Sequence, residues 1–265
     1  MAQSLNLTAG FTGLVSLAHA GFYGIGAYTA ALLSTHYGMT FWQTCPLAML
    51  LSGLVACGIA AIALRTTEDY FVICTLGIQS ILFSLMNNWM ALTHGPLGIT
   101  SIPSLAIFGY DLDSHGSFLA FSASLCAVII YLLWNLSRSG FGRVLLAIRE
   151  DEIYTQSLGK NIYLAKLQAF TLGAMLAAIA GVLYAHYISF IDPTSFMVDE
   201  SILILSMVII GGMGRIWGGV GATVLLVSLP EALRFVGLPN AIAANVRQIL
   251  YGVCLVLVVL WRRRL

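Results

Sequence analysis

The sequence predicts an all-α polytopic integral membrane protein that forms one transmembrane domain over residues 1–265. Of the 265 residues, 59% are hydrophobic and only 9% are charged, whereas soluble domains average about 25% charged residues. Apolar stretches of about twenty residues, the length that a helix needs to cross a bilayer, recur along the chain. Most Lys and Arg residues cluster between these stretches, as is typical of the loops of membrane proteins.

The apolar stretches are not all alike. Three are uninterrupted, at 45–64, 117–137 and 167–188. A fourth, 70–92, is uncharged but carries Asn87 and Asn88 near its far end. Together with two Gly-rich stretches and the last apolar run, which reaches Trp261, they predict about seven to nine membrane segments.

The distribution of Lys and Arg predicts the orientation of the chain. The cytoplasmic side should carry Arg65, the loop 138–166 and the C-terminus with its three arginines at 262–264. The loops 34–44, 93–116 and 189–200 contain no Lys or Arg and should face outward. The stretch 201–247 leaves two possibilities open. Either 201–234 enters the membrane and returns, or it crosses and a short segment near Ala241 brings the chain back.

Two Gly-rich stretches, 10–33 and 211–233, occupy corresponding positions in the two halves of the chain. Glycine costs about 1 kcal/mol relative to alanine inside a helix, so we expect broken or re-entrant helices in two pseudo-repeated halves. Paired broken helices are typical of a transport path near the bilayer midplane. The alternative is that the glycines only allow close packing of helices. The candidate path residues are His19, Gly21, Gly24, Gly26, Gly211, Gly212 and Gly214.

The ionisable residues in these Gly-rich stretches include His19, Arg215 and Glu231. His19 either contacts the path, as intramembrane ionisable groups often do, or makes a structural hydrogen bond. Arg215 satisfies carbonyl groups freed by the second interruption, pairs with Glu231, or lies at the cytoplasmic surface.

The loop 138–166 holds five of the twelve basic residues and three of the eleven acidic residues. Its segment 143–158 predicts one short amphipathic helix that Gly159 terminates. Such a helix either docks on a soluble partner protein or lies on anionic lipid. The mixed charge of Glu150, Asp151 and Glu152 argues against lipid. The candidate docking residues are Arg143, Ile148, Arg149, Glu150, Asp151, Glu152, Leu158 and Gly159.

Several functions are excluded or disfavoured by what the sequence lacks. It contains no GxxxxGK[ST] motif, so this chain is not an ATPase. It shows no nucleophile–base motif in a credible context and no His, Cys and Asp cluster with metal-ligand spacing, so we expect no catalytic residue and no metal site. The net charge of +1 argues against a nucleic-acid partner. A secondary transporter or channel remains an alternative, although acidic residues are scarce within the spans.

Three segments together resemble the LivM-type permeases of branched-chain and neutral amino-acid ABC importers. They are LNLTAGFTGLVSLAHAGFYGIGAYTAALL, FGRVLLAIREDEIYTQSLGKNIYLAK and SMVIIGGMGRIWGGVGATVLLVSLPEALR. The resemblance covers nearly the whole chain. The chain differs from the family in two respects. A further hydrophobic segment usually precedes the LNLTAGFTG motif, and the segment TTEDYFVICTLGIQ replaces a more usual arginine- and glycine-rich lead into the third span.

The resemblance implies a permease subunit in the inner (plasma) membrane of a bacterium, with 149–159 as the coupling helix. It implies four kinds of partner: a second permease of the LivH type, two ABC ATPase subunits, an external substrate-binding protein and membrane lipid. The chain itself should bind no cofactor, because ATP and Mg²⁺ belong to the ATPase subunits. The expected substrates are branched-chain or neutral amino acids, with urea or a short amide as the alternative.

Overall fold

The fold is built from long helices that run side by side. The computed structural model describes residues 1–66, 68–107, 110–111, 114–234 and 252. The first half contains α1 (Ala2–Leu5), the π-helix η1 (Asn6–Gly10), α2 (His19–Tyr37), α3 (Phe41–Ala63), α4 (Glu68–Asn88), α5 (Met90–Thr93), the 3₁₀ turn η2 (Gly95–Leu97), β1 (Ala106–Ile107) and β2 (Tyr110–Asp111). The second half contains α6 (His115–Arg138), α7 (Gly140–Glu150), α8 (Glu152–Ser157), α9 (Ile162–Ile188), η3 (Pro193–Phe196), α10 (Val198–Gly211) and α11 (Ile216–Arg234).

Five described segments are long and apolar enough to cross a membrane: Phe41–Ala63, Asp69–Asn88, His115–Arg138, Ile162–Ile188 and Pro193–Gly211. The protein is therefore a helical integral membrane protein, as the sequence predicted. The total of seven to nine segments stays a prediction. The last apolar run, the region near Ala241 and the arginines at 262–264 lie outside the described residues.

Local sequence signals set the ends of the long helices. The Ser114 side chain accepts a hydrogen bond from the Ser117 N–H (3.1 Å) at the start of α6. Asn161 does the same for the Leu164 N–H (3.0 Å) at the start of α9. Such side chains replace the partners that the first N–H groups of a helix lack. At the C-terminal end of α2, Gly38 terminates the helix in the left-handed conformation (φ 61°), which favours glycine.

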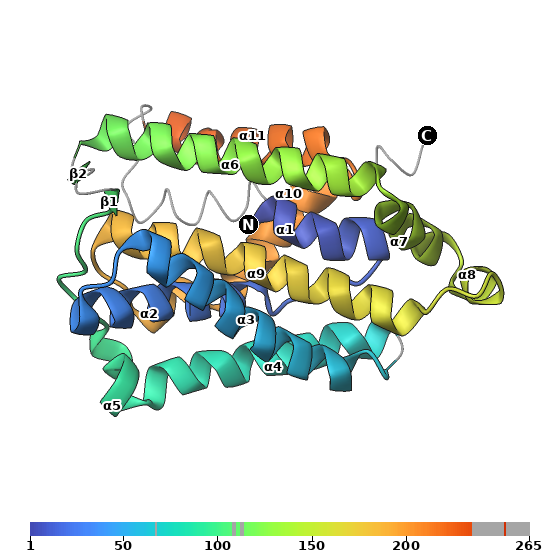
Figure 1. The fold of residues 1–265 in the computed structure, drawn as a ribbon, viewed down its shortest axis with the longest axis horizontal. Helices are drawn as coiled ribbons and strands as arrows, with labels where there is room; N and C mark the ends of the chain where they lie inside the picture. The colour runs from blue at the N-terminus through green and yellow to red at the C-terminus, as the bar shows by residue number, and fades with distance from the viewer. Residues whose placement is uncertain (67, 108–109, 112–113, 235–251, 253–265) are drawn as a thin grey trace.

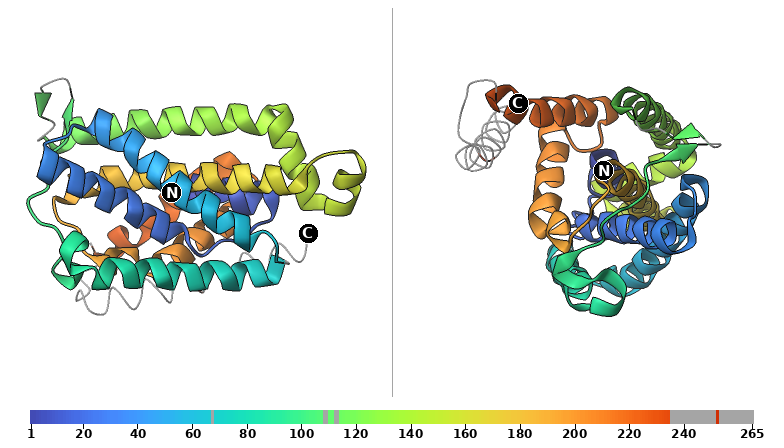
Figure 2. Two further views of the ribbon diagram at one scale, coloured as in Figure 1. Left: turned by 60° about the horizontal axis from the view of Figure 1, so that its bottom comes forward. Right: turned by 90° about the vertical axis from the view of Figure 1, so that its left-hand side faces the viewer.

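The centre of the bundle is formed by α2, α3 and α9, which pack against one another. In Figure 1 and in the left view of Figure 2, α4 and α6 lie on opposite sides of this centre. The helices α7 and α8 lie at one end of the bundle, which we call the α8 end, while α5 and the two short strands lie at the other (Figure 1). The loop 138–166 therefore contributes α7 and α8, which lie at one end of the helical bundle.

Two glycines bring α2 and α9 into backbone contact. A Cβ atom on Gly26 would lie 2.3 Å from the Ala178 carbonyl oxygen, and one on Gly181 would lie 2.1 Å from the Tyr23 carbonyl oxygen. Neither position accommodates a side chain unless the helices separate. Small residues at a crossing point allow this kind of close approach between membrane helices.

The strands are the one departure from an all-helical chain among the described residues. β1 and β2 form a two-residue antiparallel ladder. Nearby, Ile99 and Ile191 exchange backbone hydrogen bonds of 2.9 and 3.1 Å. These contacts join the loop after α5 to the loop after α9 and close the end of the bundle opposite α8.

The glycines of the bundle should differ sharply in their tolerance of alanine. Gly26→Ala forces α2 away from α9, because the new methyl group meets backbone, and we expect a loss of about 1–3 kcal/mol or more. Gly24→Ala meets the mobile end of Met86 and the Phe196 ring and should cost less. Gly77→Ala meets no atom within 4 Å, and alanine is the better helix former. Thermal unfolding in detergent measures the relative stability of the three variants. A Gly26→Ala protein as stable as Gly77→Ala would contradict the close packing of α2 against α9.

Candidate functional site: two helix interruptions and the loop at the α8 end

The first interruption lies between η1 and α2. Gly13 takes φ 79°, a conformation that favours glycine, and α2 begins only at His19. Gly21, Gly24 and Gly26, which the sequence analysis placed at the break, lie inside α2. The interruption thus precedes these glycines, and they are sites of close packing within a continuous helix.

The backbone N–H groups at the start of α2 find partners on two other helices. Thr75 Oγ1 and Gln79 Oε1, both on α4, accept from the N–H groups of Leu17 (3.2 Å) and Gly21 (2.6 Å). Ser201 Oγ on α10 accepts from the Ala20 N–H (2.9 Å). Because Gln79 lies near the middle of the 21-residue helix α4, α2 begins at the mid-depth of the bundle.

His19 is fully buried at this position. Its ring meets the ring of Phe22 edge-on, with 6.3 Å between the centroids. The packing therefore encloses His19 within this chain.

The second interruption separates α10 from α11. Gly212 and Gly214 take φ 92° and 78° and form the turn between the two helices. Gly211 packs against the next helix, where its Cβ atom would lie 2.5 Å from the Gly218 carbonyl oxygen. The stretch 201–234 is thus two helices packed against each other on either side of a tight glycine turn.

The two interruptions meet near the α8 end. A Cβ atom on Gly10 would lie 2.4 Å from the backbone nitrogen of Gly214. Asn6 Oδ1 accepts a hydrogen bond from that same N–H group (2.9 Å), and Gln3 Nε2 donates to the Ile216 carbonyl oxygen (2.9 Å). Side chains of α1 and η1 therefore satisfy the backbone of the second Gly-rich stretch.

Arg149 completes this junction. Its Nη1 donates to the carbonyl oxygens of Gly10 (2.6 Å) and Met213 (3.3 Å), one from each interruption. The sequence analysis considered Arg215 for this role. Arg215 is exposed, and the arginine that reaches the carbonyl groups comes from the loop instead.

The loop contains two helices, and the prediction of one helix over 143–158 was wrong. Asp151 adopts an extended conformation (φ −156°, ψ 109°) that ends α7. Its side chain then accepts a hydrogen bond from the Tyr154 N–H (2.9 Å) and begins α8. Aspartate is more favourable at the N-terminal cap of a helix than in its interior, so one helix ends and the next begins at Asp151, and the chain bends at this corner.

This corner divides the predicted docking residues into two groups. Ile148 on α7 is fully buried together with Leu145, and Arg149 is directed onto the interruptions. Arg143 and Glu150 on α7 are exposed, as are Asp151, Leu158 and Gly159, whereas Glu152 is half-buried. Gly159 takes φ 77° with no atom within 4 Å of a Cβ position, so it is a free left-handed stop after α8.

The exposed apolar surface of the loop lies on and just after α8. Ile153, Tyr154 and Leu158 are 82%, 64% and 60% exposed. The predicted docking residues did not include Ile153 or Tyr154. The signal that marks them is the helix start at Asp151 followed by acidic Glu152, which sets a new helix with its own faces.

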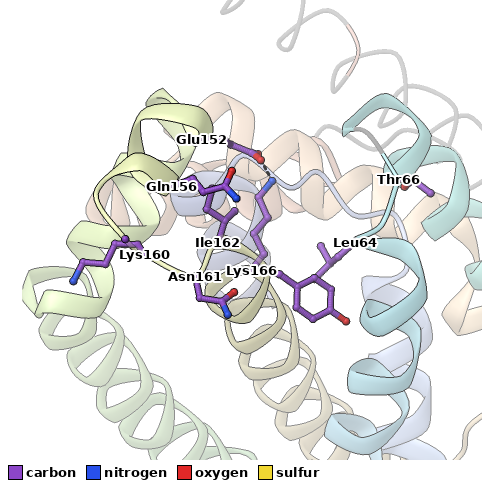
Figure 3. Close-up of a pocket in the computed structure, with 10 residues that line it drawn as sticks. Leu64, Thr66, Glu152, Gln156, Lys160, Asn161, Ile162 and Lys166 are labelled. Atoms are coloured by element: carbon purple, nitrogen blue, oxygen red, sulfur yellow. Dashed lines mark hydrogen bonds and ion pairs between the residues drawn. The ribbon is translucent and has the colours of Figure 1, made fainter.

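A cavity of about 760 Å³ lies beside α8. It is bounded by α8, the start of α9 and the end of α3, including Leu64 and Thr66 (Figure 3). In its wall Lys166 of α9 reaches Glu152 of α8 and forms an ion pair (Figure 3). This ion pair ties α8 to the central helix of the bundle.

The chain was compared with known proteins. The model of the family "Branched-chain amino acid transport system / permease component" matches residues 1–259. The chain belongs to this permease family. No solved structure matches it.

Three relatives show the range of the family. The high-affinity branched-chain amino acid permease protein LivM of Salmonella typhimurium is 36% identical over 97% of this chain and 64% of its own length. LivH of the same organism is 26% identical over 88% of this chain and 80% of its own. The autoinducer 2 import permease LsrC of Yersinia pestis is 26% identical over 82% of this chain and 61% of its own length. The chain spans 64% of the length of the LivM proteins that it matches.

Gln79 should be essential for the start of α2. Its amide is fully buried, and its Nε2 also donates to the Phe196 carbonyl oxygen (2.7 Å). Gln79→Leu leaves the Gly21 N–H and this carbonyl oxygen without a partner, at about 1–3 kcal/mol each. We expect a clearly lower melting temperature in detergent. Ser80→Ala, next to it on the exposed face of α4, should leave the melting temperature unchanged, and equal melting of both variants would contradict the role of Gln79.

Proposed function

We propose that this chain is the permease subunit of an ABC importer that carries branched-chain or neutral amino acids. The observation that carries the proposal is α8, a short helix at one end of a membrane bundle, with exposed apolar side chains and an ionic attachment to α9. An apolar patch on an otherwise polar loop is typical of a protein–protein interface. Family membership supports the same function.

The partners follow from this role. α8 and the residues up to Gly159 form the surface on which an ABC ATPase subunit docks, and the ATPase pair binds ATP and Mg²⁺. A LivH-type permease forms the other half of the path, and an external binding protein delivers the substrate. LivH is itself similar to this chain, which supports a pair of related permeases.

The orientation and topology follow from the sequence. The membrane is the bacterial plasma membrane, and the loop 138–166 and the C-terminus face the cytoplasm under the positive-inside rule. We infer seven to nine membrane segments in two pseudo-repeated halves, each with one interrupted helix. The whole of 1–265 is one permease domain.

Transport proceeds by alternating access. The nucleotide favours one of two conformations of the ATPase pair, and α8 carries this bias to the membrane helices. The path runs between the two interruptions. The start of α2, with His19, Gly21, Gly24 and Gly26, lies on one side of it, and the turn after α10, with Gly211, Gly212 and Gly214, lies on the other. Broken helices are suited to this place because they leave backbone groups free to contact a substrate.

Two alternatives to this proposal remain distinct. A urea or short-amide permease has the same architecture and differs only in its substrate. The similarity to LsrC, an autoinducer 2 import permease, supports keeping a substrate other than an amino acid as an alternative. A secondary transporter or channel needs no ATPase. Dependence of uptake on ATP separates this class from an ABC importer.

Replacement of Ile153 by aspartate should weaken ATPase binding. Ile153 is 82% exposed, so the substitution leaves the fold intact while it places a charge in the proposed interface. We expect at least about thirty-fold weaker binding, the effect of losing one interface hot spot of about 2 kcal/mol. Co-purification of the ATPase subunits with the permease pair from membranes measures this. Ser157→Ala on the same helix is the control, and full retention of the ATPase with Ile153→Asp would contradict docking at α8.

The substrate class can be tested with the complete complex in proteoliposomes. ATP-driven uptake of labelled leucine should be suppressed by excess isoleucine, valine or alanine and unaffected by excess urea. Complexes with an inactive ATPase should take up no leucine. Suppression by urea alone would assign the path to amides, and uptake without ATP would contradict the ABC class.

A further inference from the structure

We propose that Arg149 is the positioning residue that transmits the movement of α8 to both helix interruptions. The inference rests on the proposed function, because it assumes that α8 is where the ATPase acts. It adds the connection between that surface and the path. Without the Arg149 guanidinium, ATP hydrolysis should continue but should no longer drive substrate movement.

The first argument is the geometry of the guanidinium. Although Arg149 is exposed, it is directed back onto the protein from the last turn of α7. Its Nη1 donates to the carbonyl oxygens of Gly10 and Met213 at 2.6 and 3.3 Å. Gly10 is the last residue of η1, and Met213 follows the end of α10. Carbonyl groups at helix ends lack partners within the helix, so one cation serves both interruptions.

The second argument is that the two interruptions form one junction. The Gly10 and Gly214 backbones are in direct contact, and Asn6 Oδ1 accepts from the Gly214 N–H (2.9 Å). A Cβ atom on Gly214 would lie 2.9 Å from Arg149 Nη1. A displacement of Arg149 therefore acts on both Gly-rich stretches together.

The third argument is the position of α7. Leu145 and Ile148 are fully buried in a cluster that includes Leu7, Phe11 and Ile216, which flank the same two interruptions. Apolar contacts of this kind are non-directional, so they hold α7 against the junction without fixing its register. The charge-assisted hydrogen bonds of Arg149 are directional and fix it.

The last argument is the short distance along the chain from the docking surface. Only Asp151 separates α7 from α8. On its other side, α8 is tied to α9 through Glu152 and Lys166. A force applied to Ile153 and Tyr154 therefore reaches the junction through Asp151, α7 and Arg149.

The test uses the complete importer, with its second permease, ATPase subunits and binding protein, in proteoliposomes. Arg149→Ala should retain the ATPase subunits and hydrolyse ATP at the wild-type rate, while uptake per ATP falls at least ten-fold. Arg149→Lys keeps the charge but loses the planar fork, and its uptake per ATP should be intermediate. Arg65→Ala removes a positive charge from the end of α3, away from the junction, and should behave as wild type.

Two outcomes would overturn the proposal directly, and a third is decided by the lysine variant. Unchanged uptake per ATP in Arg149→Ala means that Arg149 transmits nothing. Loss of the ATPase subunits from both Arg149 variants assigns this residue to the docking surface. If only Arg149→Ala fails to assemble, Arg149→Lys decides: a lower uptake per ATP supports the proposal and an unchanged one contradicts it. A wild-type chain that neither binds the ATPase nor transports with ATP contradicts the proposed function itself, whatever the variants do.

A distance measurement distinguishes transmission from a purely structural role of Arg149, because a structural role alone would not make the distance depend on nucleotide. Spin labels at Gln156 on α8 and at Arg215 beside the second interruption, in a background without cysteine, report whether the two move together. With Arg149 present, the distance should stay constant when nucleotide is added. With Arg149→Ala, the distance should change with nucleotide, because α8 then moves alone. A constant distance in the variant would contradict transmission through Arg149.

Discussion

Within a membrane, every backbone N–H and C=O group that a helix interruption releases needs a partner inside the protein, because hydrocarbon offers none. The two interruptions of this chain meet this constraint with side chains from distant elements. Gln79 and Ser201 serve the start of α2, Asn6 serves the turn after α10, and Arg149 serves both this turn and the end of η1. The elements that carry these side chains are thereby fixed to the interruptions, and the arrangement of α4, α7 and α10 around them follows.

The parts of the fold that depend on local sequence were predictable. Long apolar stretches predicted the spans, and glycines together with charges marked the interruptions and the loop. The partners of the interruptions were not predictable. Arg149 and the carbonyl groups that it contacts are 139 and 64 residues apart in sequence, and only the packed bundle brings them together. Arg215, which lies beside the second interruption in sequence and was one candidate for these carbonyl groups, is exposed. Gln79 looked like an ordinary polar residue in an apolar span.

The loop illustrates a second limit of sequence patterns. Apolar and charged residues alternate across 143–158 with a period close to that of one helix. The Asp151 side chain begins a new helix instead, and the apolar residues of the two helices differ in their burial. Leu145 and Ile148 are buried, while Ile153 and Tyr154 are exposed. Periodicity predicts that a face is apolar, but it does not tell whether the chain itself or a partner covers that face.

The same packing indicates which part of the bundle can move in the proposed transporter. α8 is attached to α9 by the ion pair between Lys166 and Glu152, and α9 meets α2 through backbone contacts at Gly26 and Gly181. A close-packed contact of this kind resists deformation. The interruptions are different, because Gly13, Gly212 and Gly214 have no side chain and lie between helices, where residues can absorb the φ/ψ changes of a hinge. A displacement of α8 is therefore resisted by the central helices and taken up at the interruptions, where the Arg149 guanidinium already holds both stretches.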